Sequence, residues 1–402
     1  MLTLVEALGR LLGAVAPLDA IETLSTFDAL GRVLRADVHS AIAVPPQDNS
    51  AMDGYALRCA DVAVAGTLLA VSQRIPAGSV GEPLQPGTAA RIFTGAQVPP
   101  GADAVVMQEL CEAVGQGVRV NAVPSLGLSI RLRGEDVEPG SVVLNAGMRL
   151  TPQALGLAAT VGAATLQVTR RPRVALFSTG DELAMPGEPL KPGAIYNSNR
   201  FTLRAVLQAL GCDCTDLGIV PDRLDATRDA LRRAAQGCDL IVSSGGVSVG
   251  EEDHLRPAVL AEGRLDLWQI AIKPGKPLAF GAVRRPDGSE AHFVGLPGNP
   301  VSSLITFLLT VRPLILRLQG ASLLTPRRAT MRADFDWPKA DRRREFLRVR
   351  RNAEGGLDLF PNQSSGVLTS TVWADGVVDN PSDHVIARGD AVEFISFAEW
   401  LA

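Results

Sequence analysis

The sequence is poor in the residues that build disulfide frameworks and zinc sites. Its 402 residues include only 5 cysteines and 4 histidines. The cysteines form no Cys-x-x-Cys pair and show no paired spacing, which favours buried reduced thiols over disulfides or metal ligands. The histidines are scattered along the chain, which argues against a zinc site. The cysteines are Cys59, Cys111, Cys212, Cys214 and Cys238.

The sequence also lacks a strong excess of one charge and long apolar runs. With 39 basic and 43 acidic residues the formal net charge is −4, which argues against bulk nucleic-acid binding. No apolar run approaches the length of a membrane span. Thr3 and Glu6 have the spacing of a helix capping box, and Glu6 and Arg10 interrupt what would be the apolar part of a signal peptide. We therefore expect a cytoplasmic globular protein without membrane contact.

The pattern of the sequence changes along its length, which predicts several domains. A helical start, a helical segment at 27–34 and a helix around 152–160 suggest a mixed linking domain. Short strands with Pro/Gly turns predict a β-rich domain inserted into it. Regular β/α alternation follows, and then the strand-like alternation of a small β domain. The predicted domains are 1–43 with 135–171 (linking), 44–134 (β-rich), 172–320 (α/β) and 321–402 (C-terminal β).

The α/β segment predicts a parallel sheet covered by helices on both faces. Strands are expected at 174–177, 215–220 and 240–243. Asn199 is positioned to cap a helix that ends before Gly211, and Asn299-Pro300 is typical of a helix start. Pro313 should kink that last helix. Because ligands bind beyond the carboxyl ends of parallel strands, the loops at 178–182, 221–222 and 244–253 should share one edge.

The loop at 244–253 carries the strongest single indication of function. Ser244, Gly245, Gly246 and Ser248 follow a buried strand, and three acids end the loop at 251–253. Glycines let backbone N–H groups approach an anion closely. The acids suit a phosphate that arrives with a divalent metal. The loop therefore predicts a site for a phosphorylated ligand and a hard cation.

Three further motifs each allow a structural and a functional interpretation. Residues 178–183 read Ser-Thr-Gly-Asp-Glu-Leu, which is either a capped turn or a set of ligand and metal donors. Lys273 and Lys276 are held in a turn stiffened by prolines, which is either an exposed basic turn or an oxyanion site. Pro297, Gly298 and Asn299 precede a helix, where free N–H groups bind anions and where simple capping is the alternative.

Seven motifs in order resemble those of the molybdopterin molybdenumtransferases, the MoeA family, which includes the gephyrin E domain. They begin at residues 48, 91, 133, 178, 243, 273 and 296, and they read Asp-Asn-Ser-Ala-Met-Asp-Gly-Tyr-Ala, Arg-Ile-Phe-Thr-Gly-Ala, Arg-Gly-Glu-Asp, Ser-Thr-Gly-Asp-Glu-Leu, Ser-Ser-Gly-Gly-Val-Ser-Val-Gly, Lys-Pro-Gly-Lys-Pro and Leu-Pro-Gly-Asn-Pro-Val-Ser. Taken alone, the first two are better explained as turns than as functional sites. The resemblance spans essentially the whole chain.

The resemblance implies an elongated homodimer of four-domain subunits, with an α/β domain like the molybdopterin-binding fold. Members insert molybdenum from molybdate into adenylylated molybdopterin, release AMP and use Mg²⁺. Two alternatives stay open, a molybdopterin adenylyltransferase and a gephyrin-like scaffold. Transient contact with the adenylyltransferase and with acceptor molybdoenzymes is a further implication.

By motif position, the resemblance implies catalytic roles for Asp53, Thr94, Glu182, Asp222 and Lys273. It implies metal binding by Glu182, Asp222 and Asp253. The implied substrate-binding residues are Arg131, Asp136, Ser244, Gly245, Gly246, Ser248, Lys276, Pro297, Gly298, Asn299 and Arg348. In the family's dimer the 48–56 and 91–96 segments of one subunit face the α/β domain of the other. Gln269 stands where many relatives carry lysine, which removes one charge from the expected oxyanion pocket.

Overall fold

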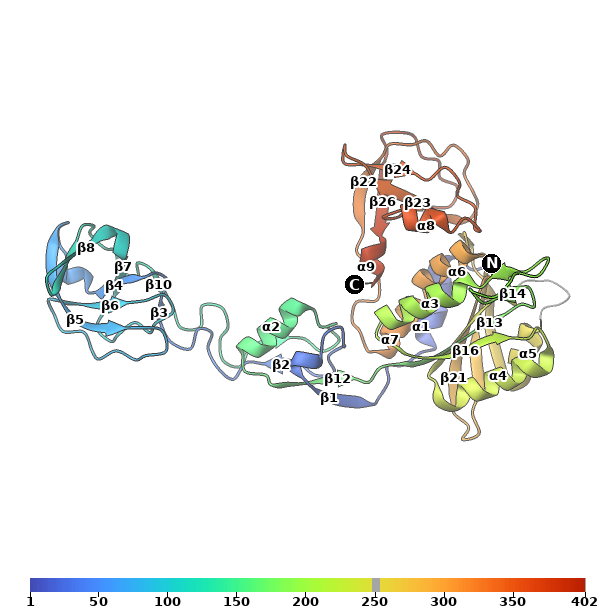
Figure 1. The fold of residues 1–402 in the computed structure, drawn as a ribbon, viewed down its shortest axis with the longest axis horizontal. Helices are drawn as coiled ribbons and strands as arrows, with labels where there is room; N and C mark the ends of the chain where they lie inside the picture. Colours follow the sequence, from blue (N-terminus) through green and yellow to red (C-terminus); the bar gives the residue numbers. More distant parts are fainter. Residues whose placement is uncertain (248–253, 402) are drawn as a thin grey trace.

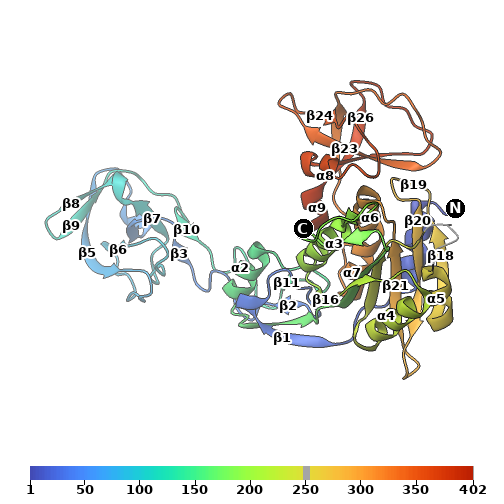
Figure 2. The ribbon, with the colours of Figure 1, turned by 45° about the vertical axis from the view of Figure 1, so that its right-hand side comes forward.

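The computed structural model describes residues 1–247 and 254–401, and the chain is elongated. A β-rich domain lies at one end, a small mixed part follows it, and an α/β domain lies at the other end (Figure 1). The C-terminal β domain sits beside the α/β domain, on the side of α3 and α6 (Figure 2). The predicted multidomain fold class, with one α/β domain between β domains, is confirmed.

The β-rich domain is built on a six-stranded sheet with the order β7-β4-β6-β5-β9-β8. Its two faces bury separate apolar clusters, one around Ile75 and Ile92 and one around Leu57 and Val118. A short β3–β10 ladder closes one end. The elements are β3 (Asn49–Ser50), β4 (Gly54–Leu57), η2 (Cys59–Asp61), β5 (Thr67–Ile75), β6 (Thr88–Ile92), β7 (Ala104–Met107), η3 (Gln108–Leu110), β8 (Cys111–Val114), β9 (Gly117–Val120) and β10 (Ile130–Arg131).

The linking part consists of two short ladders and one helix. Its elements are β1 (Ile21–Ser25), η1 (Thr26–Asp28), β2 (Val38–His39), β11 (Val142–Leu144), α2 (Pro152–Thr160) and β12 (Thr165–Thr169). The helix expected around 152–160 is confirmed. We expected a helical segment at 27–34, but only the single 3₁₀ turn η1 forms there, so the prediction is wrong for the rest of the segment. There the backbone pairs with a distant segment instead, since the Leu34 amide donates to the Met148 carbonyl at 3.0 Å.

Helix α1 (Leu4–Gly13) begins at the capping box that the sequence predicts. The Thr3 amide donates to Glu6 Oε2 at 2.8 Å, and the Glu6 amide donates to Thr3 Oγ1 at 3.2 Å. We expected this helix in the linking domain, but its buried residues Leu4, Ala7 and Leu11 pack in the core of the α/β domain. Periodicity shows that a helix has an apolar face, but it does not show which domain covers that face.

The α/β domain has a six-stranded sheet with the order β16-β13-β17-β21-β20-β18. The four strands from β16 to β21 are parallel, as expected, whereas β20 runs antiparallel to both of its neighbours, β21 and β18. The difference arises because a tight hairpin joins β20 to β21, and a two-strand hairpin is necessarily antiparallel. The strands are β13 (Arg173–Thr179), β16 (Asp213–Val220), β17 (Leu240–Ser244), β18 (Gly263–Gln269), β20 (Pro277–Arg284) and β21 (Glu290–Leu296).

Helices cover both faces of this sheet (Figure 1). One apolar cluster joins the sheet to α1, α3 and the long helix that begins at Pro300, and a second joins the other face to α4 and α5. The sequence placed the cap of α3 at Asn199, but Asn197 caps it and Asn199 lies inside its first turn. The remaining elements are β14 (Leu183–Ala184), β15 (Ile195–Tyr196), α3 (Ser198–Ala209), α4 (Leu224–Gly237) and α5 (Leu255–Glu262).

The helix that follows β21 consists of α6 (Pro300–Thr306), a π-helical turn η4 (Phe307–Val311) and α7 (Arg312–Leu318). We expected Pro313 to kink this helix. The π-turn ends two residues before it, at Val311, and Pro313 itself lies in the first turn of α7. By length and composition the whole stretch could cross a membrane, but 83% of its most apolar window is buried in the fold. Its hydropathy is therefore that of a core helix.

The C-terminal domain has a six-stranded sheet that includes β19 (Ile272–Lys273), a strand contributed by the α/β domain. Lys273 pairs with Glu345 in a parallel bridge, so the two domains share one sheet. The other elements are β22 (Ala329–Ala333), β23 (Arg344–Arg351), β24 (Gly356–Leu359), α8 (Thr369–Trp373), β25 (Gly376–Asn380), β26 (Ala391–Ser396) and α9 (Phe397–Leu401).

Candidate functional site

A cavity of about 650 Å³ lies at the carboxyl ends of the parallel strands β13, β16, β17 and β21. Strands that run in parallel present their carboxyl ends at one edge, so residues from distant parts of the sequence meet there. The shared edge predicted for the three loops is confirmed for the described residues. The predicted site residues that line the cavity are Glu182, Asp222, Ser244, Gly245, Gly246, Pro297, Gly298 and Asn299.

The glycines after β17 allow their loop to pack tightly against the end of β13. Gly245 and Gly246 have φ of 91° and 67°, the left-handed region that glycine tolerates. A Cβ on Gly245 would lie 2.5 Å from the Thr179 carbonyl oxygen, and one on Gly246 would lie 2.7 Å from Thr179 Oγ1. The Gly245 amide donates to the Leu296 carbonyl at 3.1 Å, so it is committed to the protein and not to a ligand.

Two of the three predicted metal ligands face the cavity from different loops. Glu182 follows β13, and its carboxylate folds back over Gly180, where a Cβ would lie 2.4 Å from Glu182 Oε2. Asp222 follows β16, and its amide donates to Asp181 Oδ1 at 3.2 Å. The third ligand, Asp253, and the substrate-binding Ser248 lie outside the described residues. Within residues 1–247 and 254–401 no group of three potential metal ligands is assembled.

The C-terminal domain closes one side of the cavity. Asn299 occupies the N-cap position of α6, as predicted, although its side chain makes no capping bond. The Val301 amide at the start of this helix donates to the Ser365 carbonyl at 3.0 Å, and Gly366 lines the cavity. A loop of the C-terminal domain therefore takes up one of the free N–H groups that the sequence assigned to an anion.

Arg348 does not line the cavity but lies under this loop. Its guanidinium donates to Ser370 Oγ at 3.2 Å and to the carbonyls of Phe346 and Ser364 at 3.1 and 3.4 Å. Burial lowers the pKa of Arg348 to about 10, because desolvation disfavours its charged form. Through its contact with Ser364, Arg348 holds the 364–366 loop in place beside the cavity.

The two lysines predicted to bind an oxyanion differ in their surroundings. Lys273 Nζ lies 2.9 Å from Glu345 Oε1 and 3.2 Å from Asp341 Oδ2. Burial alone would lower the pKa of Lys273, but hydrogen bonds to Glu345 and Asp341 outweigh it and raise the pKa. Lys276 is exposed, and its neighbour Pro277 lines the cavity. Lys273 therefore forms ion pairs between the two domains, and any oxyanion would have to compete with two carboxylates for it.

The remaining predicted residues lie at the other end of the molecule. Thr94 donates from its amide and its hydroxyl to Asp53 Oδ1, at 2.8 and 2.7 Å. These two hydrogen bonds hold the pKa of Asp53 below its usual value. Arg131 lies on β10 opposite Asn49, so it shares this region of the β-rich domain. Asp136 follows on the connection to the linking part, where its amide donates to the Val44 carbonyl at 3.0 Å.

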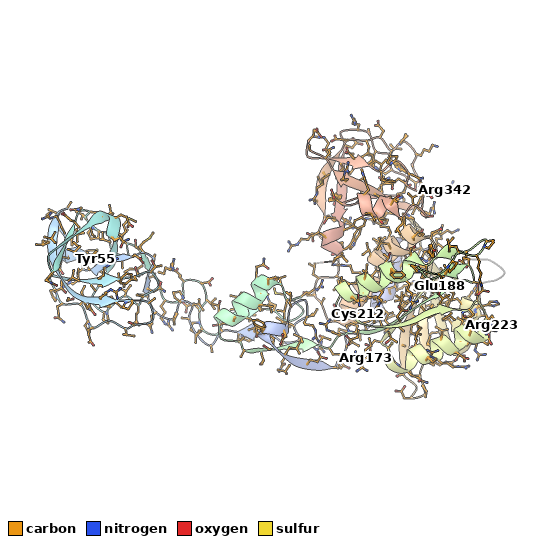
Figure 3. The ribbon with its side chains drawn as sticks, viewed as in Figure 1. Tyr55, Arg173, Glu188, Cys212, Arg223 and Arg342 are labelled. Carbon is orange, nitrogen blue, oxygen red and sulfur yellow. The ribbon has the colours of Figure 1, made fainter. Side chains whose placement is uncertain are left out.

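The two sets of residues are far apart within one chain. Tyr55, two residues beyond Asp53, lies at one end of the molecule (Figure 3), whereas Arg223, next to Asp222, lies at the opposite end. One subunit by itself therefore does not bring the predicted catalytic residues together.

The sequence did not indicate several residues that line the cavity, among them Tyr196, Asn197 and Asn199. Asn199 Nδ2 donates to Ser244 Oγ at 2.8 Å and to the Gly298 carbonyl at 2.7 Å. It therefore ties together the loops after β17 and β21. The stretch from Ile195 to Asn199, an apolar and an aromatic residue followed by Asn-Ser-Asn before a helix, was the signal that could have revealed them.

Three family models match successive parts of the chain. They are described as the MoeA N-terminal region (domain I and II), a probable molybdopterin binding domain, and the MoeA C-terminal region (domain IV). They match residues 2–162, 175–317 and 330–397. The second match contains every described cavity-lining residue except Gly366, which lies in the third, and the first contains Asp53 and Thr94.

Curated proteins and a solved structure agree with these matches. A molybdopterin molybdenumtransferase of Haemophilus influenzae is 42% identical, over 80% of this chain and 78% of the relative. A molybdopterin molybdenumtransferase 2 of Mycobacterium tuberculosis is 37% identical, over 92% and 94%. The crystal structure of the molybdopterin biosynthesis moeA protein from Pyrococcus horikoshii aligns with a TM-score of 0.85 at 28% identity, over 99% of this chain and 100% of that chain. The chain therefore belongs to the MoeA family of molybdopterin molybdenumtransferases.

Proposed function

We propose that this protein inserts molybdenum from molybdate into adenylylated molybdopterin and releases AMP, with Mg²⁺ bound in the cavity. The observation that carries the proposal is the convergence of Glu182, Asp222 and the Gly245–Gly246 loop at the carboxyl edge of the sheet. The names of the curated relatives support the transfer of molybdenum to molybdopterin. The geometry supplies a cavity in which a phosphorylated ligand and a hard cation can be held together.

The cavity's donor set fits magnesium and a phosphoanhydride. Carboxylate oxygens are the ligands that Mg²⁺ prefers, and Glu182 and Asp222 would hold it, with Asp253 as the expected third ligand. Held by these carboxylates, a divalent cation would supply charge neutralisation at the phosphates. Ser244 and Asn197 line the same space and would orient polar groups of the substrate, while the Asn199 amide holds the Ser244 hydroxyl and the Gly298 carbonyl in place. Holding the dithiolene and molybdate in one place is mainly a positioning task.

We further propose that the working enzyme is a homodimer with composite sites. Asp53 and Thr94 are fixed to each other at one end of the chain, and the cavity lies at the other end. A site that uses both groups then needs the β-rich domain of a second subunit. This arrangement also accounts for the elongated shape, which extends the β-rich domain away from its own cavity.

Mixing two inactive variants tests the composite site. Asp53→Ala and Asp222→Ala should each abolish molybdate-dependent AMP release, because each removes one half of the site. After subunit exchange, the mixture should regain part of the wild-type rate, since a heterodimer contains one intact site. No regain, with exchange verified by differently tagged subunits, would show that each site is built within one chain.

The same assay separates the proposed reaction from its rivals. A molybdopterin adenylyltransferase would consume ATP and form the adenylylated pterin, whereas a scaffold would show no turnover. We expect AMP release from adenylylated molybdopterin that depends on both molybdate and Mg²⁺. We also propose that the protein works in the cytoplasm, in transient contact with the adenylyltransferase and with acceptor molybdoenzymes.

A further inference from the structure

The short strand β15 brings an aromatic ring and an amide to the wall of the cavity. Tyr196 is one of only 2 tyrosines in the chain, and among the described residues that line the cavity it is the sole aromatic one. Its side chain is 45% exposed, and it belongs to none of the apolar clusters of the described residues. Core packing therefore does not explain why a large ring stands here.

The ring of Tyr196 is held in position from two sides. Its hydroxyl donates to the Glu188 carbonyl at 3.0 Å. Its backbone lies between two ladder bonds, in which the Ile195 and Asn197 amides donate to the carbonyls of Glu182 and Ala184 at 2.8 and 2.9 Å. An exposed ring fixed in this way loses little further freedom when a flat ligand stacks on it.

The next residue, Asn197, offers an unused hydrogen-bond donor. Its Oδ1 accepts from the Arg200 amide at 3.1 Å and so caps α3. The side chain is 2% exposed, and its Nδ2 has no hydrogen-bond partner within the described part of the chain. Buried polar groups are nearly always paired, so a donor left over beside a cavity points to a ligand acceptor.

We propose that Tyr196 stacks on the flat nitrogen heterocycle of the substrate and that Asn197 Nδ2 donates to an acceptor on the edge of that ring. The inference rests on the proposed function, whose substrate contains two such rings, a pterin and an adenine, each joined to a phosphate. Both have a π-face and ring-edge acceptors, which is the chemistry that a tyrosine beside an amide recognises. Tyr196 is thus a binding residue that selects for a ring, while the acidic residues would hold the metal that binds the phosphates.

Binding measurements with ligands that differ only in the ring test this assignment. The probes are AMP, ribose phosphate and a hydroxymethylpterin phosphate, each titrated into the full-length protein with Mg²⁺ by calorimetry. AMP and ribose phosphate share the phosphate and the sugar, so the ratio of their affinities isolates the adenine. Tyr196→Leu should lower the affinity for the ring-bearing ligand about tenfold and leave the affinity for ribose phosphate unchanged. A tenfold change is in line with what one base–aromatic stacking contact contributes to binding. Tyr196→Phe should retain most of the affinity.

Two further variants serve as controls. Phe201→Leu removes an exposed ring from α3 that does not line the cavity, and it should leave every affinity unchanged. Asn197→Ser keeps a capping oxygen for α3 but removes the amide, so it should weaken the ring-bearing ligand at an unchanged melting temperature. Bound AMP or pterin phosphate should also protect Tyr196 from nitration, as measured by peptide mass spectrometry.

The outcomes separate this inference from the proposed function. A loss confined to AMP or to the pterin phosphate supports the site and identifies which ring Tyr196 holds. Wild-type protein that binds neither ring-bearing ligand more tightly than ribose phosphate overturns the inference, as does Tyr196→Leu that binds all three like wild type. These measurements involve no molybdate and no turnover. Ring-dependent binding without any molybdate-dependent AMP release would therefore overturn the proposed function alone.

Discussion

The cavity and the end of the β-rich domain hold the two sets of predicted site residues, and they are built in different ways. Around the cavity, Glu182, Asp222 and Ser244 come from separate strands and meet because those strands are parallel. In the β-rich domain, Asp53 and Thr94 meet because one side chain hydrogen-bonds the other directly. The first set depends on the packing of a whole sheet, and the second depends on a local contact.

This difference matters for the chemistry that each set can perform. Asp53 has its charged form stabilised by Thr94, so its carboxylate is prepared before any ligand arrives. The cavity carboxylates lie next to glycine-rich loops where the backbone approaches closely, so that a ligand and a cation can complete the site. In the function proposed above, the cavity would hold the metal and the phosphates, and Asp53 would act on a ligand already held there.

The largest expected effect comes from neutralising a cavity carboxylate. Asp222→Asn should lower molybdate-dependent AMP release at least about a hundredfold, the usual cost of losing a group that stabilises developing charge. The free energy of unfolding should stay the same. Asp225→Asn is the matched control, because Asp225 lies three residues away, largely exposed, beside Arg223. Equal activity of Asp222→Asn and Asp225→Asn would remove the metal role from Asp222.

The next effect tests whether Lys273 serves stability or anion binding. Lys273→Gln leaves the buried carboxylate of Glu345, whose side chain is only 1% exposed, without its cation. We expect a loss of about 1–3 kcal/mol in the free energy of unfolding, measured by urea denaturation. Lys276→Gln, at an exposed position in the same turn, should leave the unfolding free energy unchanged. A molybdate titration of both variants then shows which lysine the oxyanion uses.

The pH dependence of this stabilisation follows from the raised pKa of Lys273. A group whose folded pKa exceeds its unfolded value stabilises the fold fully below the unfolded value. The unfolding free energies of wild type and Lys273→Gln should therefore differ at neutral pH. The difference should shrink as the pH rises above 10.5, the ordinary pKa of lysine, because Lys273 loses its charge as the pH passes the raised pKa of the folded state. A difference that stays constant across that range would contradict the ion pair.

A smaller effect is expected from the glycine loop. Gly246→Ala places a Cβ 2.7 Å from Thr179 Oγ1 at a φ of 67°, which should destabilise the protein by about 1–2 kcal/mol. Gly298→Ala is the control, because its Cβ would lie 3.9 Å from the nearest atom. Both melting temperatures are measured by calorimetry. If the two variants melt together, tight packing of the loop against β13 is not what requires glycine.

The smallest effect concerns the β-rich domain. Thr94→Val removes the hydroxyl that donates to Asp53 but keeps the backbone amide, so the pKa of Asp53 should rise part of the way to its usual value. An NMR pH titration of the Asp53 carboxyl measures it. The melting temperature should not change, since both side chains are at the surface. An unaltered titration would show that the amide alone sets the pKa.

Much of the fold follows from local signals in the sequence. The capping box of α1, the parallel strands β13, β16 and β17 and the start of the helix at Pro300 were predicted from caps, glycines and periodicity. The cap of α3 was misplaced by two residues, because Asn197 and Asn199 are equally good capping residues and only the backbone geometry separates them. The domain boundaries at 44, 134, 171 and 320 stay predictions.

The sequence by itself determined that the glycine-rich and acidic loops follow parallel strands and gather at one edge of the sheet. This follows because β/α alternation sets the direction of the strands and therefore the edge at which their carboxyl ends lie. Only the tertiary structure decided that α1 packs on the α/β domain and that β19 joins the C-terminal sheet. It also decided that Lys273 is paired with Glu345 and that the β-rich domain, which holds Asp53, lies at the other end of the molecule from the α/β domain (Figure 1). These are contacts between residues distant in sequence, and no local propensity, cap or turn encodes which partner a buried face or a charged side chain will meet.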